Sequence, residues 1–289
     1  MSKPPDAFCG KLVYMSENVN VLAVDLGASH GRVIRGVFDG KTIRMETVYD
    51  FQNHPMKVGD SYFWDHIAMA SNVEEGIKKA GPSLSVGVDA WGHDYIPLSK
   101  NGEIIGQMFS YRDSRTDRVA QDVSELVSEE DSYYKTGEGI NGIATRVQLY
   151  ALKKECPDTY EATESIVTVA DYINYLLCHE ARINETQVSM GGMMDIETRS
   201  WSSEILGNLG LKPSFGKIVR CGEVIGKTKD GMNVVAVAAH DTASAFAFLP
   251  DYSEDHLILS SGTWALVGIK TRNPIMDEET LRGNVQNYK

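Results

Sequence analysis

The sequence lacks a long apolar stretch. No run within its 289 residues approaches the ~18 consecutive apolar residues that a membrane-spanning helix needs. The first residues, MSKPPDAFCGK, carry prolines and charges where a secretory signal peptide needs an apolar segment. We therefore expect no membrane partner and a cytoplasmic location.

Cysteine is also scarce. Four cysteines are scattered along the chain, and no two of them form a C-x-x-C pair: Cys9, Cys156, Cys178 and Cys221. Such wide spacing favours neither a compact disulfide framework nor a zinc site. We expect reduced thiols with structural roles.

Basic residues are outnumbered. Twenty-eight Lys and Arg stand against 40 Asp and Glu, so the formal net charge is −12 at pH 7. Proteins that bind nucleic acid or anionic membranes usually carry a basic surface. We expect no nucleic-acid partner, and any phosphate group must be held by a local cluster of donors.

What remains is the composition of an ordinary globular protein, with 42% hydrophobic and 24% charged residues. The length suits one large domain or two smaller ones. Apolar periodicity and turn signals predict a strand hairpin at 19–38, strands at 42–51 and 84–91, helices at 65–79, 114–127, 145–154 and 171–178, a strand leading into a helix at 234–249, and a second hairpin at 256–269. This order predicts a mixed α/β fold behind a loose leader at residues 1–18.

Two turns rich in glycine and serine join the strands of the two predicted hairpins. The first lies within Asp25–Arg32, and the second lies within Leu259–Trp264. Small residues leave backbone N–H groups free to face an anion, and an aspartate at a strand end can orient a metal ion or its waters. Each turn alone is also compatible with a plain hairpin. Together they suggest two halves of one polyphosphate site.

An acidic residue, Asp241, follows the apolar run before His240 and opens a helix of small residues. One interpretation is a helix cap, since a carboxylate there satisfies N–H groups and the helix dipole. The other is a general base at the floor of a cleft, which accepts a proton from an attacking hydroxyl. The spacing leaves both interpretations open.

A further group of polar and aromatic residues lies in Asp89–Tyr95 and Tyr111–Thr116. Sugars are held by paired polar groups and an aromatic face, so these segments are candidates for sugar binding. A surface position is the alternative for His93, and a helix-start ion pair is the alternative for Arg112 and Asp113. The methionine-rich segment 189–195 is interpreted as irregular packing.

Five segments together resemble a known family. VLAVDLGASHGR, GVDAWGHDY, YRDSRT, AAHDTASA and LSSGTWALVG occur in the order and at the approximate spacing found in the FGGY carbohydrate kinases, and they are most similar to the rhamnulokinase branch. They extend from about residue 19 to residue 270, which is nearly the whole chain. The resemblance implies a ribonuclease H-like, actin-like ATPase fold, with a mixed sheet flanked by helices and two lobes around a nucleotide cleft.

The resemblance also implies roles for individual residues. Asp241 would be the proton acceptor, and Asp25 would lie near Mg²⁺, directly or through water. The ATP phosphates would be contacted by Ala28, Ser29, His30, Gly31 and Arg32, joined by Gly262 and Thr263. The sugar would be lined by Gly92, His240, Asp241 and Thr242, with Trp91, His93, Asp94 and Arg112 as further candidates. The expected partners are ATP with Mg²⁺ and a small sugar, most simply L-rhamnulose converted to L-rhamnulose 1-phosphate.

Three departures from the family pattern qualify these expectations. His30 replaces the usual serine, and His93 replaces an apolar residue beside Gly92, which leaves open a kinase for another ketose or a deoxy sugar. The chain ends at Lys289, before the adenine-binding motif of such kinases. We expect a first lobe at 19–240, the opening of a second, truncated lobe at 241–289, and no kinase activity from this piece alone. A non-catalytic sugar-binding module is the alternative.

Overall fold

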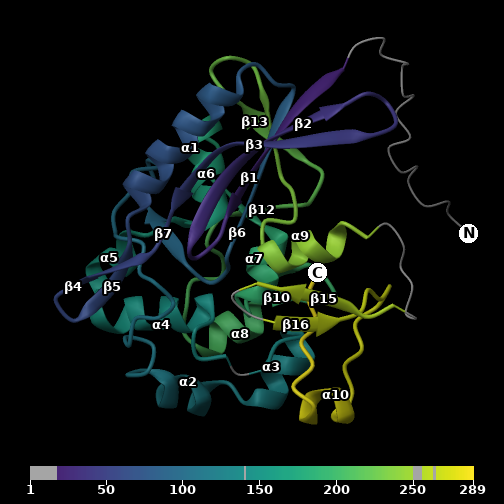
Figure 1. The fold of residues 1–289 in the computed structure, drawn as a ribbon. Coiled ribbons are helices and arrows are strands. Elements are labelled where there is room, and N and C mark those ends of the chain that lie inside the picture. Colours follow the sequence, from purple (N-terminus) through teal and green to yellow (C-terminus); the bar gives the residue numbers. More distant parts are fainter. Residues whose placement is uncertain (1–17, 140, 250–255, 263–264) are drawn as a thin grey trace, which may run out of the picture.

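A six-stranded mixed sheet forms the centre of the computed structural model, which describes residues 18–139, 141–249, 256–262 and 265–289 (Figure 1). The strand order is β13-β14-β6-β1-β2-β3. β1 pairs antiparallel with β2 and parallel with β6, and β14 pairs parallel with β6. The strands are β1 (Val19–Leu26), β2 (His30–Phe38), β3 (Ile43–Gln52), β6 (Ser85–Ala90), β13 (Val224–Lys227) and β14 (Asn233–Val235). The predicted hairpin and the two predicted strands after it are confirmed.

The first strand shows why the sheet forms. Leu22, Val24 and Leu26 on alternate positions are buried, whereas Ala23 between them is exposed. A period of two sends these side chains to one face of the sheet. That face carries the first hydrophobic core.

Helix α1 (His66–Ala80) crosses this face against β2 and β3. It begins where predicted, because the Asp65 carboxylate accepts the backbone N–H of Ala68 at 2.9 Å. Within the helix, a Cβ on Gly76 would lie 2.4 Å from Val33 Cγ2. The close approach of helix and sheet therefore requires glycine at position 76.

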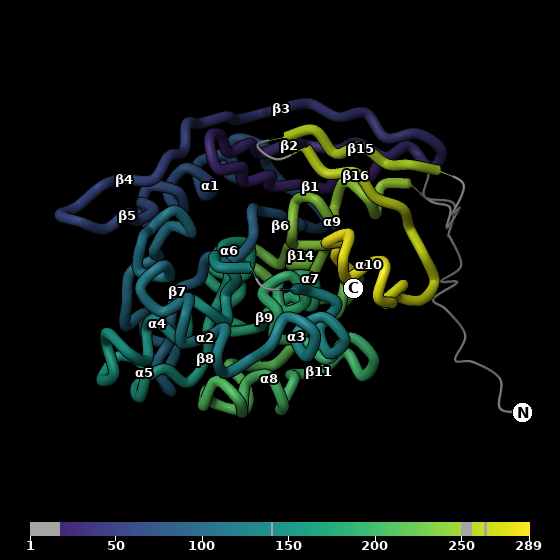
Figure 2. The backbone as a smooth tube through the Cα atoms, turned by 90° about the horizontal axis from the view of Figure 1, so that it is seen from below, coloured from purple at the N-terminus to yellow at the C-terminus, as the bar shows by residue number. Residues whose placement is uncertain are grey.

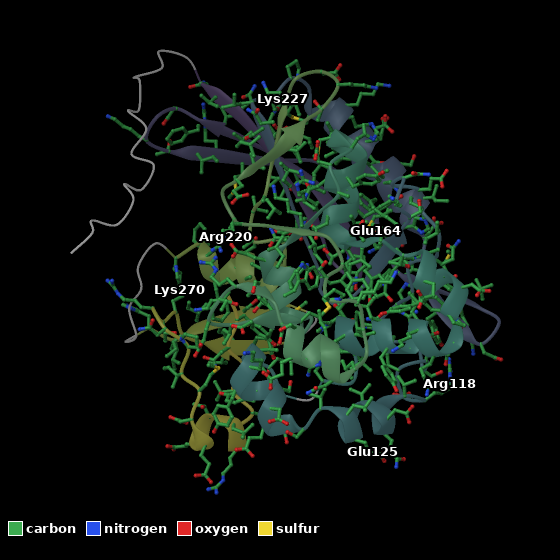
Figure 3. The ribbon with its side chains drawn as sticks, turned by 180° about the vertical axis from the view of Figure 1, so that it is seen from behind. Arg118, Glu125, Glu164, Arg220, Lys227 and Lys270 are labelled. Carbon is green, nitrogen blue, oxygen red and sulfur yellow. The ribbon has the colours of Figure 1, made fainter. Side chains whose placement is uncertain are left out.

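Most of the remaining helices lie below the sheet in Figure 1 and have a hydrophobic core of their own. The helices are α2 (Ala120–Leu126), α3 (Glu129–Thr136), α4 (Thr145–Glu155), α5 (Pro157–Ala162), α6 (Val169–Cys178), α7 (Glu185–Met190) and α8 (Ser203–Asn208). Of these, α6 packs against β6 and β13 of the central sheet. Figure 3 shows Arg118 and Glu125 at the outer edge of this helical part.

The prediction of a helix at 114–127 was too long, since α2 begins at Ala120. The preceding residues form successive turns, in which Asp117 N–H donates to Ser114 O and Val119 N–H donates to Thr116 O. The Asp113 carboxylate accepts the backbone N–H of Arg115 at 2.9 Å. This side-chain bond offers the backbone an alternative to helical hydrogen bonds.

Four short strand pairs were not predicted. They are β4 (Pro55–Val58) with β5 (Ser61–Trp64), β7 (Tyr95–Leu98) with β8 (Ser165–Thr168), β9 (Arg182–Asn184) with β12 (Lys217–Val219), and β10 (Met194–Asp195) with β11 (Ser200–Trp201). Figure 2 shows the β4–β5 hairpin projecting from one end of the molecule. Strands of two to four residues are too short to give a periodic sequence signal.

The C-terminal segment contains α9 (Asp241–Ala247), the antiparallel pair β15 (Ile258–Ser261) and β16 (Ala265–Gly268), and α10 (Glu278–Arg282). The predicted second hairpin is thus confirmed. The last residues return to the helical part, where the Asn287 N–H donates to Gly137 O at 2.8 Å. None of the helices within the described ranges is both long and apolar enough to cross a membrane.

Candidate active site

The carboxyl ends of β1 and β6 bring the predicted site residues together. These strands are parallel neighbours, and Asp25 on β1 is paired in register with Asp89 on β6. An isolated bridge joins Ala90 to His240, which aligns the residues before α9 with the same edge. In open α/β sheets, ligands bind at the carboxyl ends of parallel strands. Asp241, next to His240, therefore lies at this sheet edge close to Asp89, although it is distant from β1 and β6 in the sequence.

The β1–β2 turn is exposed, and hydrogen bonds from Asn53 fix its backbone. Ser29 and His30 are exposed at its tip. Asn53 fastens the turn, because its backbone N–H donates to Ser29 O at 2.8 Å and its side-chain amide donates to Gly27 O at 3.0 Å. A Cβ on Gly31 would lie 2.2 Å from the Phe51 ring, so only glycine fits there. Sequence reasoning missed the supporting role of Asn53.

Arg32 faces Asp25 across the β1–β2 pair, and the two side chains form an ion pair. About half of the Arg32 side chain is exposed. A guanidinium so placed can turn from its carboxylate to an incoming phosphate, because arginine binds both groups with the same pair of donors.

Asp89, which the sequence offered only as part of a candidate sugar-binding segment, lies instead beside Asp25 at the sheet edge. Burial, assisted by the charges of Asp25 and Asp241, raises the pKa of Asp89 to about 7. Its Oδ1 atom is buried and has no hydrogen-bond donor. An acid inside the apolar run SVGVDAW was the available signal, since a buried carboxylate is uncommon without a partner.

Asp241 is the first residue of α9, and Thr242 follows it. Its Oδ1 accepts the Thr242 backbone N–H at 2.6 Å and lies 3.4 Å from His240 Nε2. A helix N-terminus stabilises a carboxylate. Burial lowers the pKa of His240, so this imidazole is neutral. It therefore forms no ion pair with the Asp241 carboxylate. The N-cap of α9 is His240, which makes no side-chain cap bond, so Asp241 is not the cap residue itself, although its Oδ1 accepts one N–H group in the first turn of the helix.

Gly92 and His93 form a tight bend beside His240. A Cβ on Gly92 would lie 1.5 Å from Met190 Cε and 3.5 Å from His240 Cδ2. His93 adopts a φ of 76°, and its carbonyl accepts the Thr145 hydroxyl at 2.9 Å. Burial lowers the pKa of His93 to about 3, so the ring is neutral at physiological pH.

Asp94 is placed in the interior rather than at a ligand-facing surface. It is fully buried, and its Oδ2 accepts the indole N–H groups of Trp64 at 2.6 Å and Trp91 at 2.9 Å. Its Oδ1 accepts the Gln148 amide at 3.0 Å. Asp94 and Trp91 therefore stabilise the bend at Gly92 from the buried side.

Two other predicted site residues, Arg112 and Gly262, lie at the surface. Arg112 is exposed and its guanidinium lies near the Tyr111 ring. Gly262 is exposed at the end of β15. Among the residues that the structure describes, no hydrogen bond joins Gly262 to the first turn. Thr263 lies outside the described residues.

Residues 20–245 match the family model described as the FGGY family of carbohydrate kinases, N-terminal domain. The chain belongs to this family. The rhamnulokinase of Mannheimia succiniciproducens is 35% identical over 276 residues, and that of Bacteroides thetaiotaomicron is 32% identical over 282 residues. Each match covers 93% of this chain but only 57% and 58% of the relative, respectively.

Solved structures place this FGGY-family chain among sugar kinases by fold. The gluconate kinase of Lactobacillus acidophilus superposes with a TM-score of 0.75 at 18% identity, covering 87% of this chain and 54% of that one. The Plasmodium falciparum glycerol kinase, solved with ADP, gives a TM-score of 0.70 at 16% identity with the same coverage. The ribonuclease H-like, actin-like ATPase fold predicted from the sequence is confirmed. The chain spans little more than half the length of these relatives.

The carboxylates of this family member suit a magnesium ion that arrives with phosphate. Within the described part of the chain, no three His, Cys, Asp or Glu side chains are grouped to hold a metal ion by themselves. Mg²⁺ is usually held by one or two carboxylates together with phosphate oxygens and waters. Asp25 and the donor-free Oδ1 of Asp89 supply such a pair at one sheet edge. The donor set therefore fits Mg²⁺ bound together with a nucleotide.

Proposed function

We propose that the protein is an ATP-dependent kinase that transfers the γ-phosphoryl group to the 1-hydroxyl of L-rhamnulose. The observation that carries this proposal is the position of Asp241. Its carboxylate opens α9 at the same sheet edge as Asp25, Asp89 and the exposed β1–β2 turn. The names of the Mannheimia and Bacteroides relatives support the choice of sugar.

In the proposed reaction, Asp241 accepts the proton of the sugar 1-hydroxyl. The sugar oxygen bonds to the γ-phosphorus of ATP while the bond from that phosphorus to the β,γ-bridging oxygen breaks and releases ADP, and the proton passes to Asp241 late in this step. Such phosphoryl transfer depends chiefly on positioning and on stabilising charge. A carboxylate suffices as the acceptor because the proton leaves late in such a transfer.

The phosphates are assigned to the backbone of 28–32 and the Arg32 guanidinium, with Gly262 and Thr263 approaching from the second turn. Asp25 and Asp89 would hold a Mg²⁺ ion that arrives with the nucleotide, and the ion would supply positive charge to the phosphate oxygens. The exposed tip at Ser29 and His30 and the exposed half of the Arg32 side chain support this assignment.

The sugar is assigned to Gly92, His240 and Thr242, next to the proton acceptor. Met190 packs directly on Gly92, so a side chain at position 92 would collide with Met190 beside the proposed sugar site. His93 stands beside Gly92, at a position where the family usually has an apolar residue. This difference next to the proposed sugar site makes another ketose the second candidate substrate. The proposal includes a first lobe at 19–240, the start of a second at 241–289 and a cytoplasmic location.

Ligand binding to the 289-residue chain tests the choice of sugar. L-rhamnulose, L-fuculose, D-xylulose and D-ribulose are titrated while chemical shifts of backbone amides are followed by NMR. We expect L-rhamnulose to bind most tightly and to shift amides at 92–93 and 240–242. Preference for another ketose would replace the substrate, and absence of binding by every ketose would refute the sugar site.

Turnover is tested in a chimera in which the remaining part of the Mannheimia rhamnulokinase follows this chain. Asp241→Asn should reduce ATP-dependent phosphorylation by about 10²–10⁴-fold, the usual contribution of a general base, without loss of sugar binding. Asp158→Asn on the surface of α5 serves as the matched control. Near-normal turnover by the Asp241→Asn chimera would refute the assignment, and an inactive parent chimera that still binds sugar would favour a non-catalytic module.

A further inference from the structure

A pocket lies between β5, β7, α4 and α5. Figures 1 and 2 both show these elements on the side of the molecule away from α9. The pocket has a volume of about 230 Å³ and is lined mainly by apolar and aromatic side chains, among them Phe63, Phe109 and Leu152. An apolar cavity of ~150 Å³ is large enough to bind benzene. This pocket therefore has room for a single ring and one small substituent.

One charged side chain lines this pocket. Arg115 is only 4% exposed, and its guanidinium carbon lies 3.9 Å from the centre of the Phe109 ring. Its Nη2 donates to Gln148 Oε1 at 2.6 Å, while its Nε is buried without an acceptor. The guanidinium thus retains donor capacity.

The charge of Arg115 lies over the Phe109 ring but has no carboxylate partner among the described residues. Across residues 18–139, 141–249, 256–262 and 265–289, no carboxylate forms an ion pair with Arg115. The neighbouring Asp113 carboxylate instead accepts the backbone N–H groups of Tyr62 and Arg115. Asp94 reaches Arg115 only through the Gln148 amide, whose nitrogen donates to Asp94 and whose oxygen accepts from Arg115.

Buried charges in proteins are normally paired, because desolvation of an isolated ion is costly. An unpaired guanidinium at the wall of an apolar pocket therefore favours an anionic ligand. Carboxylates match the guanidinium donors, and an apolar ring matches Phe63, Phe109 and Leu152. Inorganic phosphate and sulfate have no apolar surface to pack against the apolar side chains of the pocket.

We propose that this pocket binds a small monocarboxylate with an apolar, ring-sized body, with its carboxylate paired to Arg115. The proposal does not depend on the kinase reaction, since none of the side chains that line the pocket is assigned to ATP, Mg²⁺ or the sugar in the proposed reaction. Benzoate is the probe, and benzamide, which has nearly the same shape without the charge, is the matched control ligand.

Cys156 provides the reporter, because it lines the pocket and is an exposed free thiol. The rate of its alkylation by iodoacetamide is followed by peptide mass spectrometry in the 289-residue chain, with N-acetylcysteine in the same tube as a measure of reagent activity. We expect benzoate to slow the alkylation of Cys156 several-fold at saturation and benzamide to leave it unchanged. Equal protection by both ligands, or no protection by benzoate, would overturn the proposal.

Variants separate the charge from the shape of the pocket. Arg115→Gln should weaken benzoate binding about tenfold or more, the loss expected when one charge-assisted pair is removed. Arg118→Gln is the matched control, because Arg118 lies on the outer surface, pairs with Glu155 and does not line the pocket (Figure 3). Unchanged benzoate affinity in a folded Arg115→Gln variant would refute the role of Arg115.

A third variant decides the matter if Arg115→Gln does not fold. Thr159→Phe places a ring in the pocket from the half-buried face of α5 and leaves Arg115 in place. It should abolish the effect of benzoate on Cys156, whereas continued protection would show that benzoate binds elsewhere and would overturn the proposal.

Discussion

The contact between Gly92 and Met190 allows a quantitative test of the candidate sugar site. An alanine Cβ at position 92 would lie 1.5 Å from Met190 Cε and 2.5 Å from Met190 Sδ. Since the φ of Gly92 lies outside the left-handed region, the expected penalty is steric rather than conformational. Met190 is 4% exposed, so its side chain cannot simply swing into solvent. Overpacking of this kind costs about 1–3 kcal/mol.

A double-mutant cycle isolates that steric cost. Met190→Ala alone should lower the free energy of unfolding by about 2–5 kcal/mol, the usual loss for a buried methionine. In the double variant the new Cβ finds the space that Met190 vacated. We therefore expect Gly92→Ala and Met190→Ala to be less than additive, with a coupling of about 1–3 kcal/mol.

Urea unfolding of the four proteins, followed by circular dichroism, measures each free energy of unfolding. Gly207→Ala is the control, because a Cβ at that position meets no atom within 4 Å. Additive effects of the two substitutions, or a Gly92→Ala variant as stable as the parent, would refute the packing argument and with it the view that position 92 must be glycine.

Two further predictions concern stability. Asp65→Ala should lower the free energy of unfolding by about 1 kcal/mol through loss of the α1 cap, while Asp65→Asn should retain most of it; equal losses in urea unfolding would contradict the cap. Burial raises the pKa of Asp171 to about 7, well above the ordinary value of an aspartate, so the folded protein holds a proton that the unfolded chain releases. Its contribution to stability is therefore lost as the pH rises from about 4 to about 7, by up to about 1.4 kcal/mol per pH unit. Asp171→Asn should be more stable than the parent above that range, with a difference that shrinks toward about pH 4; a pH-independent difference would contradict the raised pKa.

The parts of the fold that were predictable have strong local signals. The β1–β2 hairpin follows from β-branched runs on either side of a glycine-containing turn, and α1 follows from an aspartate cap and a Gly-Pro stop. Asp241 could be placed at a helix start for the same reason, because an apolar strand ends just before it. These signals lie within a few residues of the feature they predict.

Other features depend on residues that are distant in sequence. Asp89 acquires its environment from Asp25 on one neighbouring strand and Asp241 after another, so its raised pKa has no local signature. Asp94 appeared to be a polar candidate for sugar contact because nothing in its own segment shows that Trp64 and Gln148 occupy its oxygens. Contacts of this kind arise only once the sheet and the helical part are assembled.

The candidate sugar-binding bend lies where the two hydrophobic cores meet. Trp91 belongs to the core of the central sheet, and Tyr95 belongs to the core of the helical part. Between them, the His93 carbonyl accepts the Thr145 hydroxyl from α4, and a φ of 76° at His93 is maintained by these contacts from both sides. A non-glycine residue keeps such a conformation only when the surrounding structure fixes it. The shape of the proposed sugar site therefore depends on the docking of α4 against the sheet, and a substitution that loosens this docking should weaken sugar binding without touching a sugar-facing side chain.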